Sequence, residues 1–179
     1  MMELSHQQML ALWRRRLGFD EIRDDCSVEV FEGRQVNDLI ATAMRSWYLR
    51  LLDSADTRLL PVGIVSYTDC LSAGRNLLRI VPAANVRRVI AVEAPRWDHP
   101  VTPIPYQDAT DALNLLKGPF GAPSASAPLA VDTGHRDILA APLQLSDAFS
   151  LYGIADPGND RYILDEVLLD TIPNSLKLL

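Results

Sequence analysis

The segment Asp132-Thr133-Gly134 is the first place where this sequence could carry out chemistry. It follows the apolar run LAV (residues 129–131) and comes shortly before a second apolar run, ILAA (residues 138–141). An aspartate in a turn between two strands can act as an acid or a base in hydrolysis when a second carboxylate shares its proton. One such segment per chain suffices if two copies of the chain each supply one aspartate. One hypothesis is therefore a small hydrolase that uses Asp132.

These three residues also resemble the active-site motif of aspartic proteases, which in the dimeric retroviral enzymes occurs once per chain. Two departures weaken this hypothesis. The families place a small residue after the glycine, where this chain has His135, and they brace the loop with an apolar-apolar-Gly stretch that FSLYGIAD (residues 149–156) replaces poorly. The alternative is a hairpin turn in which Asp132 caps the turn and Gly134 takes the left-handed conformation. The sequence favours the turn.

The three histidines offer a second source of acid–base or metal chemistry. His99 lies in RWDHP and His135 in DTGHRD, and each has an aspartate nearby. With Asp98, Asp132 and Asp137 they could supply a metal site or an acid–base pair, as a metal-assisted hydrolase would require. Nothing in the spacing brings them together, and no helical His-x-x-x-His pair occurs. We favour the interpretation that both are surface histidines in turns, and we expect no metal site.

Other chemistry-bearing motifs are missing from the sequence. It has neither Gly-x-x-x-x-Gly-Lys-[Ser/Thr] nor Gly-x-Gly-x-x-Gly, and no Gly-x-Ser-x-Gly elbow. The prolines of GPFGAP (residues 118–123) remove amide donors that a phosphate loop requires. Cys26 and Cys70 lack the close spacing of a zinc site or a disulfide framework. We expect no bound cofactor and, on balance, no enzyme.

The charge distribution argues against nucleic acid as a partner. The net charge of the chain is −6. Residues 1–90 carry 12 basic and 11 acidic side chains, a net of +1, and residues 91–179 carry 5 and 12, a net of −7. The acidic second half repels phosphate backbones. The basic triplet at residues 14–16 lies close to four acidic residues, which can neutralise it.

The same sequence predicts a protein that is cytoplasmic when synthesised. No apolar run precedes the basic triplet, so we expect no signal peptide. No apolar stretch approaches the length of a membrane span, so we expect no membrane partner. Two cysteines without close spacing are typical of free thiols in a reducing compartment.

Helical periodicity is clearest in the first third of the chain. Ser5 is placed to cap a helix that runs to about Leu17 and stops at Gly18. The segment RQVNDLIATAMRSWYLRLLDSA (residues 34–55) has apolar residues at three- and four-residue steps and predicts a helix of about 20 residues. Trp47 and Tyr48 point about 100° apart on such a helix, so we expect one of them to lie at a second interface.

Short strands with turns are expected after this helical part. Strand patterns occur at residues 77–82 and 86–97, and again in PLAVDT, DILAAPL and FSLYGIAD. QDATDALNLLKG (residues 107–118) predicts a short helix, and YILDEVLLDTI (residues 162–172) is compatible with another. DHPVTPIPY (residues 98–106) holds three prolines and must be extended.

This order of elements predicts an α+β fold. A helical N-terminal region, residues 1–57, precedes a β-rich region, residues 58–179, with Pro-rich loops; the two could pack as one domain. We expect a small, mostly antiparallel β-sheet or sandwich with one or two short helices. Apolar side chains without an evident place in a core are interface candidates: Trp47, Tyr48, Phe120, Leu176, Leu178 and Leu179.

The segments MRSWYLRLLDSADTRLLPV, VRRVIAVEAPRW, DHPVTPIPY, GPFGAPSASAPLAV and YILDEVLLDTIPN, in this order, resemble small structural or adaptor proteins of tailed bacteriophages and prophages. The resemblance covers residues 44–174 and rests on the general character of these segments and on their order along the chain. It implies a non-enzymatic protein that assembles by protein–protein contacts, as a homo-oligomer or docked onto a larger assembly. It also implies a virion location. Independently of the resemblance, the hypothesis of a structural protein predicts loss of assembly, with the fold intact, when Leu176–Leu179 are removed.

Overall fold

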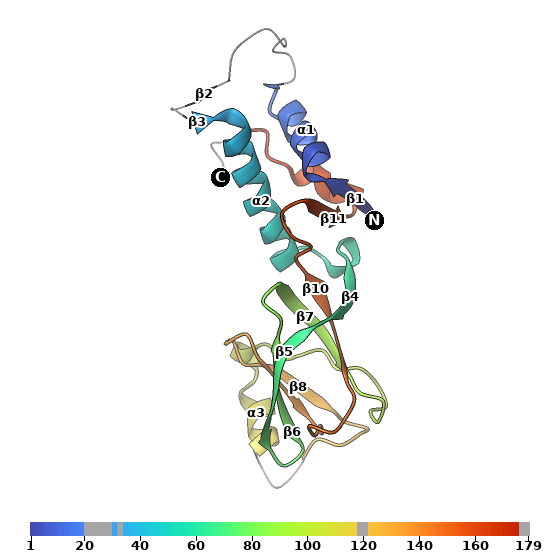
Figure 1. Cartoon of the computed structure of the whole chain (residues 1–179). Coiled ribbons are helices and arrows are strands. Elements are labelled where there is room, and N and C mark those ends of the chain that lie inside the picture. The colour runs from blue at the N-terminus through green and yellow to red at the C-terminus, as the bar shows by residue number, and fades with distance from the viewer. Residues whose placement is uncertain (20–29, 32–33, 118–121, 176–179) are drawn as a thin grey trace. The chain divides into compact units, whose positions relative to one another are not determined.

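The computed structural model describes residues 1–19, 30–31, 34–117 and 122–175 (Figure 1). Its helices and antiparallel sheets form an α+β fold, which confirms the predicted class. The chain divides into two compact units. Unit 1 comprises Met1–Pro61 and Asp156–Leu179, and unit 2 comprises Val62–Ala155. The predicted division at residues 57/58 falls near the first crossing between the units, but the chain also returns to unit 1 after Ala155.

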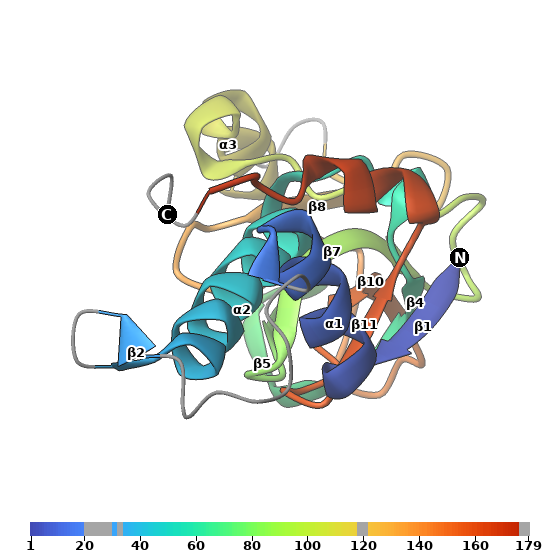
Figure 2. The same ribbon diagram turned by 90° about the horizontal axis from the view of Figure 1, so that it is seen from above.

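Two helices form the larger part of unit 1. Helix α1 (His6–Arg16) begins at Ser5, whose hydroxyl accepts a hydrogen bond from the amide of Gln8 at 3.3 Å. The Gln8 side chain accepts from the Ser5 amide at 2.9 Å, which completes a capping box. Helix α2 (Val36–Ser54) lies beside α1 (Figures 1 and 2). Both helices are close to the predicted ranges.

The remaining elements of unit 1 include two short antiparallel pairs. β1 (Met2–Ser5) pairs with β11 (Arg161–Leu164), and β2 (Val30–Phe31) pairs with β3 (Arg34–Gln35). The 3₁₀ helices are η2 (Thr57–Leu59) and η4 (Glu166–Thr171). A continuous helix over residues 162–172 is wrong, because β1 offers residues 161–164 an antiparallel partner. Asp165 then caps the tighter helix η4 by accepting from the amide of Val167.

Unit 2 contains two antiparallel sheets. The first has the order β4-β10-β7, with strands Val62–Val65, Ser150–Ala155 and Val86–Glu93. The second has the order β5-β6-β9-β8, with strands Tyr67–Gly74, Leu77–Pro82, Ile138–Ala141 and Leu129–Asp132. The strands predicted at residues 77–82 and 86–97 and the three later ones are therefore present, although β7 ends at Glu93. The polar stretch that forms β5 carries no strand pattern and was not predicted.

Both sheets contribute to one hydrophobic core. Alternation along β6 buries Leu78 and Ile80, and the partners of these residues on β9 are Ala140 and Ile138. The buried members of the cluster come from every strand of unit 2 except β5 and from the segments that follow β7 and β9: Val65, Leu78, Ile80, Val86, Val92, Ala94, Trp97, Ala130, Ile138, Ala140, Leu143 and Leu151. One strand of unit 2 thus contributes no fully buried side chain.

A second, smaller cluster lies at strand β8. Helix α3 (Thr110–Lys117) lies within the predicted helical region, residues 107–118, and follows the 3₁₀ helix η3 (Tyr106–Asp108), which begins one residue before that region. Ala109 and Ala112 pack with Val131 of β8, and all three are buried. Val131 alternates with Ala130, which belongs to the main core, so α3 covers the opposite face of the sheet at this strand.

The Pro-rich segment is extended, as predicted, and it covers one edge of each sheet. Val101 exchanges two backbone hydrogen bonds of 2.9 Å with Val92 of edge strand β7. Three residues later, Ile104 donates to Ala130 and accepts from Asp132 of edge strand β8, each at 2.9 Å. The prolines at 100, 103 and 105 lack amide donors, so the amides of Val101 and Ile104 carry this pairing.

Within the described residues, no helix combines the length and the apolarity that crossing a lipid bilayer requires.

Candidate functional site

The segment Asp132-Thr133-Gly134 forms part of the hairpin loop between β8 and β9. Asp132 Oδ1 accepts a hydrogen bond from the amide of Gly134 at 2.9 Å, and Gly134 has φ +76°. The Thr133 amide donates to the carbonyl oxygen of Asp137 at 3.0 Å and closes the loop. These contacts confirm the interpretation as a turn capped by aspartate, with glycine in the left-handed region.

Asp137, one of the aspartates that the sequence offered as a partner of the histidines, instead anchors this loop through its side-chain contacts. It is the buried acidic residue of unit 2, with 4% exposure. One carboxylate oxygen pairs with the guanidinium of Arg79 on β6, and the other accepts from the Thr133 hydroxyl. A buried carboxylate requires such partners. Asp137 is therefore best described as a structural anchor of the loop.

A cavity of about 360 Å³ lies beside the same loop. The turn between β6 and β7 and the Pro-rich segment form its other walls, through Pro82, Pro103 and Pro105. Asp132, Asp137 and Arg136 line it from the hairpin side. The cavity combines rigid apolar walls with charged groups of both signs, which is a common composition of ligand sites.

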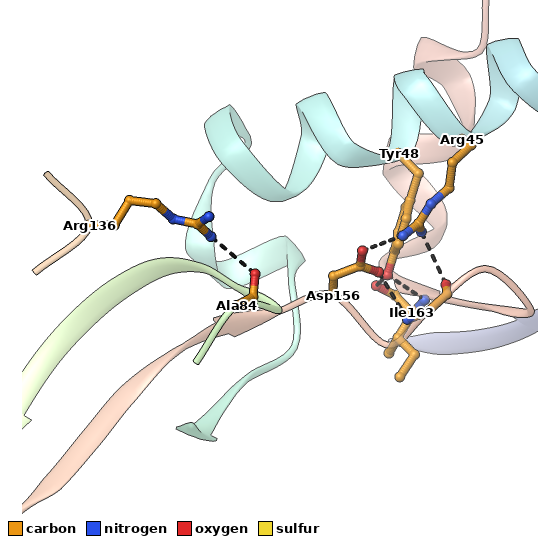
Figure 3. Close-up of polar contacts among 7 residues, drawn as sticks. Arg45, Tyr48, Ala84, Arg136, Asp156 and Ile163 are labelled. Atoms are coloured by element: carbon orange, nitrogen blue, oxygen red, sulfur yellow. Dashed lines mark hydrogen bonds and ion pairs between the residues drawn. The ribbon is translucent and has the colours of Figure 1, made fainter. Parts of the chain in front are cut away.

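Arg136 connects the loop to the opposite wall of the cavity. Its guanidinium donates to the carbonyl oxygen of Ala84 at 3.0 Å (Figure 3). Arg136 has φ +61°, a left-handed conformation that is uncommon for a residue with a side chain. The loop thus holds Arg136 across the gap between two turns of unit 2.

The two candidate histidines are exposed. Neither His99 nor His135 is among the residues that line the cavity with Asp132. His99 follows Trp97, whose indole donates to the carbonyl oxygen of Pro142 at 3.0 Å. Among the residues that the structure describes, no three His, Cys, Asp or Glu side chains are grouped so that they could hold a metal ion.

Trp47 and Tyr48 are both buried within unit 1, so the expectation that one of them faces a second interface needs correction. The Trp47 ring packs edge-on against the Trp13 ring of α1, with 5.8 Å between the ring centroids. The Trp47 indole N–H donates a hydrogen bond to the Thr171 hydroxyl of η4 at 3.2 Å. The Tyr48 ring packs edge-on against the Tyr162 ring of β11, with 4.9 Å between the ring centroids. The two directions on α2 are therefore covered by different elements of the same chain.

The Tyr48 hydroxyl completes the hydrogen bonding of β11. It donates to the Ile163 carbonyl oxygen at 3.1 Å and accepts from the Ile163 amide at 2.9 Å (Figure 3). Burial raises the pKa of Tyr48. Beside it, the guanidinium of Arg45 pairs with Asp156 and donates to the Gly158 carbonyl oxygen at 3.1 Å. This cluster joins α2 to the returning C-terminal segment.

The other interface candidates, Phe120, Leu176, Leu178 and Leu179, lie outside the described residues.

Exposed apolar side chains gather instead on two consecutive strands that the sequence did not mark. β4 and β5 are each an edge strand of a sheet, and only Ser66 separates them. Their large exposed side chains are Val62 (43%), Ile64 (72%), Tyr67 (46%) and Leu71 (47%). Among the described residues, no strand pairs with the outer side of either one. An exposed edge with apolar side chains is a template for pairing with another chain.

One acidic side chain lies on this edge. The Asp69 carboxylate accepts from the backbone amide of Cys70 at 2.8 Å. The Cys70 side chain packs partly against the main core. Burial and the neighbouring Asp69 raise the pKa of the Cys70 thiol. Cys70 is therefore a poor nucleophile at neutral pH.

No family model and no curated sequence matches this chain.

Proposed function

We propose that this protein is a non-enzymatic structural or interaction protein that assembles through protein–protein contacts. The observation that supports this proposal is the pair of edge strands β4 and β5, which expose four large apolar side chains between Val62 and Leu71. Burying apolar area of this kind is the main favourable term in protein association. The partners are other protein subunits, either copies of this chain or members of a larger assembly.

We further propose the setting in which this assembly takes place, a virion or an adaptor of a tailed phage or prophage. The support for the setting is the order of segments between residues 44 and 174 described above. Such proteins act by contact, so the proposal requires no catalytic residue.

Sedimentation velocity over a wide concentration range tests the assembly. We expect the wild-type chain to form oligomers and the Leu71→Asp variant to shift toward the monomer. Val167→Asp is the matched control, because Val167 is also aliphatic and exposed (61%) but lies on η4 of unit 1. Equal loss of assembly in both variants, or a wild-type chain that is monomeric throughout, would count against the proposal.

One observation favours a second candidate, a small hydrolase: Asp132 lines a cavity together with Asp137 and Arg136. A dimeric aspartic-protease-like or metal-assisted enzyme would use Asp132 with His135 or His99. The test is peptide hydrolysis at acidic pH by the wild-type chain and by Asp132→Asn. Activity that the substitution abolishes would establish the hydrolase, and equal rates for both proteins would exclude Asp132 as its catalytic group.

A further inference from the structure

We propose that strand β5 is the contact between two copies of this chain, paired antiparallel about a two-fold axis at Leu71. This inference rests on the proposed assembly function and specifies its geometry. Four features of the described residues carry it: the uncovered edge, the regular stretch within β5, the position of the only charge, and the direction of the backbone donors.

Some edge strands of the two sheets are covered by another segment of the chain, and others are open. The Pro-rich segment pairs with β7 through Val101 and with β8 through Ile104. β5 lies at the opposite edge of its sheet from β8, and seven of its eight residues are exposed. A fold that covers two edges with its own chain and leaves β5 open presents that edge to a partner.

Only a short part of β5 has the geometry for a new ladder. Residues 69–72 pair in regular register with residues 81–78 of β6. Register shifts, which mark β-bulges, occur before Asp69 and after Ser72. A bulge interrupts strand pairing, so the intermolecular ladder is confined to the regular stretch and its neighbours.

Charge selects the register within this stretch. Asp69 and Leu71 project from the same face, because they are two residues apart in a regular strand. A two-fold axis at Asp69 would place two carboxylates directly opposite each other, which destabilises a pair of strands. An axis at Leu71 places the two exposed Leu71 side chains opposite each other and Asp69 opposite the small Ala73. The two Asp69 residues are then offset by four positions, about 13 Å along the strand.

The backbone donors fit the same axis. The Cys70 amide donates to the Asp69 carboxylate, which places this amide on the open side of β5. Alternation then directs Leu71 toward β6 and Ser72 toward the open side. In the dimer, the amides and carbonyls of Cys70 bond those of Ser72 in the other copy, and the Leu71 pair lies between them without backbone bonds. Such a pair brings the two Cα atoms to about 4.5 Å.

Asp69 weakens the pairing of this edge with a second copy. In the single chain its carboxylate occupies the Cys70 amide that the partner's Ser72 carbonyl would use. Dimerisation exchanges one hydrogen bond for the other, so Asp69 weakens the association without preventing it. Replacing Asp69 by Ala should therefore strengthen the dimer.

Disulfide cross-linking of the full-length chain tests the geometry. The background is Cys26→Ser with Cys70→Ala, which removes both native thiols. Leu71→Cys should form a disulfide-linked dimer under mild oxidation, since disulfides need Cα atoms within about 7 Å. Ala73→Cys, whose Cα atoms would be about 13 Å apart along the strand, should not. Leu145→Cys, exposed (61%) and outside both edge strands, reports random collisions.

We expect linkage at residue 71 to be at least about tenfold faster than at 73 or 145, because pairing raises the effective thiol concentration. Adding Asp69→Ala should increase the rate further. Equal rates at all three positions would overturn the inference. No linkage at 71, with a wild-type chain that sediments as an oligomer, would overturn the β5 pairing and leave the assembly function standing. No linkage together with a monomeric wild-type chain would refute both the β5 pairing and self-assembly of the chain.

Discussion

The facing glycines of β4 and β10 allow a matched test of packing in unit 2. Gly63 and Gly153 are directly opposite each other in the antiparallel pair. A Cβ atom added at Gly153 would lie 2.3 Å from the backbone oxygen of Arg88 on the neighbouring strand β7. A Cβ added at Gly63 would meet no atom within 4 Å. The same substitution by alanine therefore meets opposite surroundings on two paired residues.

The size of the expected change in the free energy of unfolding follows from this steric clash. Normal van der Waals contact begins near 3.4 Å, so the β7 backbone must move by about 1 Å to admit the methyl group that Gly153→Ala adds. Overpacking of this kind costs about 1–3 kcal/mol. Alanine gains about 0.5–1 kcal/mol over glycine inside a strand, which Gly63→Ala realises in full. We expect Gly153→Ala to lower the free energy of unfolding of unit 2 by about 2 kcal/mol, and Gly63→Ala to raise it by about 0.5–1 kcal/mol.

The assay must report unit 2 by itself, because a chain with two compact units need not unfold in one step. Trp97 is the tryptophan of unit 2, and Trp13 and Trp47 belong to unit 1. Urea titration of protein labelled with 5-fluorotryptophan, followed by fluorine NMR, separates the Trp97 signal from the other two. Equal midpoints for the two alanine variants at Trp97 would refute the reasoning, since only one of them meets backbone.

Three further predictions concern single contacts. Tyr48→Phe should destabilise unit 1 by about 1–3 kcal/mol, because it leaves the Ile163 amide and carbonyl without the hydroxyl, and urea unfolding measures the loss. The raised pKa of Tyr48 in the folded chain makes its contribution complete below about pH 10 and reduces it as pH rises further, so Tyr48→Phe should show a flatter alkaline stability profile; an equally steep profile would contradict this assignment. Asp137→Ala should cost more stability than Asp137→Asn, because Asn keeps an acceptor for Thr133, and equal midpoints would show that this bond contributes nothing. In a Cys26→Ser background, the Cys70 thiol should react with a disulfide reagent at pH 8 more slowly than in unfolded chain, and Asp69→Asn should speed the reaction, since both causes of the raised pKa disfavour the thiolate.

Local signals in the sequence were sufficient for the helices and for most strands of unit 2. The Ser5 cap and the apolar stripe of residues 34–55 are properties of the segments themselves, and both helices form close to where these signals place them. β5 had no such signal, because both its faces are largely exposed and alternation of apolar residues records burial. β11 depends on β1, which lies more than 150 residues earlier in the sequence, and local periodicity contains no such information.

At the candidate site, too, local patterns predicted the turn but not the contacts between residues that are remote in sequence. The turn chemistry of Asp132 and Gly134 was predictable, because an aspartate two residues before an amide caps that amide within the turn. The role of Asp137 depends on Arg79, which is remote in sequence and reaches it through the pairing of β6 with β9. The exposure of Val62 and Ile64 follows from the place of β4 at a sheet edge, which a strand pattern does not reveal.

The discontinuity of unit 1 has a consequence for synthesis on the ribosome. The chain leaves unit 1 at Pro61 and returns at Asp156, while unit 2 begins and ends on paired strands, with Val62 opposite Ile154. A nascent chain can therefore complete unit 2 before the partners of α2 in β11 and η4 have been made. Until then Tyr48 lacks Ile163 and Trp47 lacks Thr171, so α2 is made before unit 2 but reaches its final packing after it. We expect the N-terminal helices to be the part of the newborn chain that depends most on chaperones.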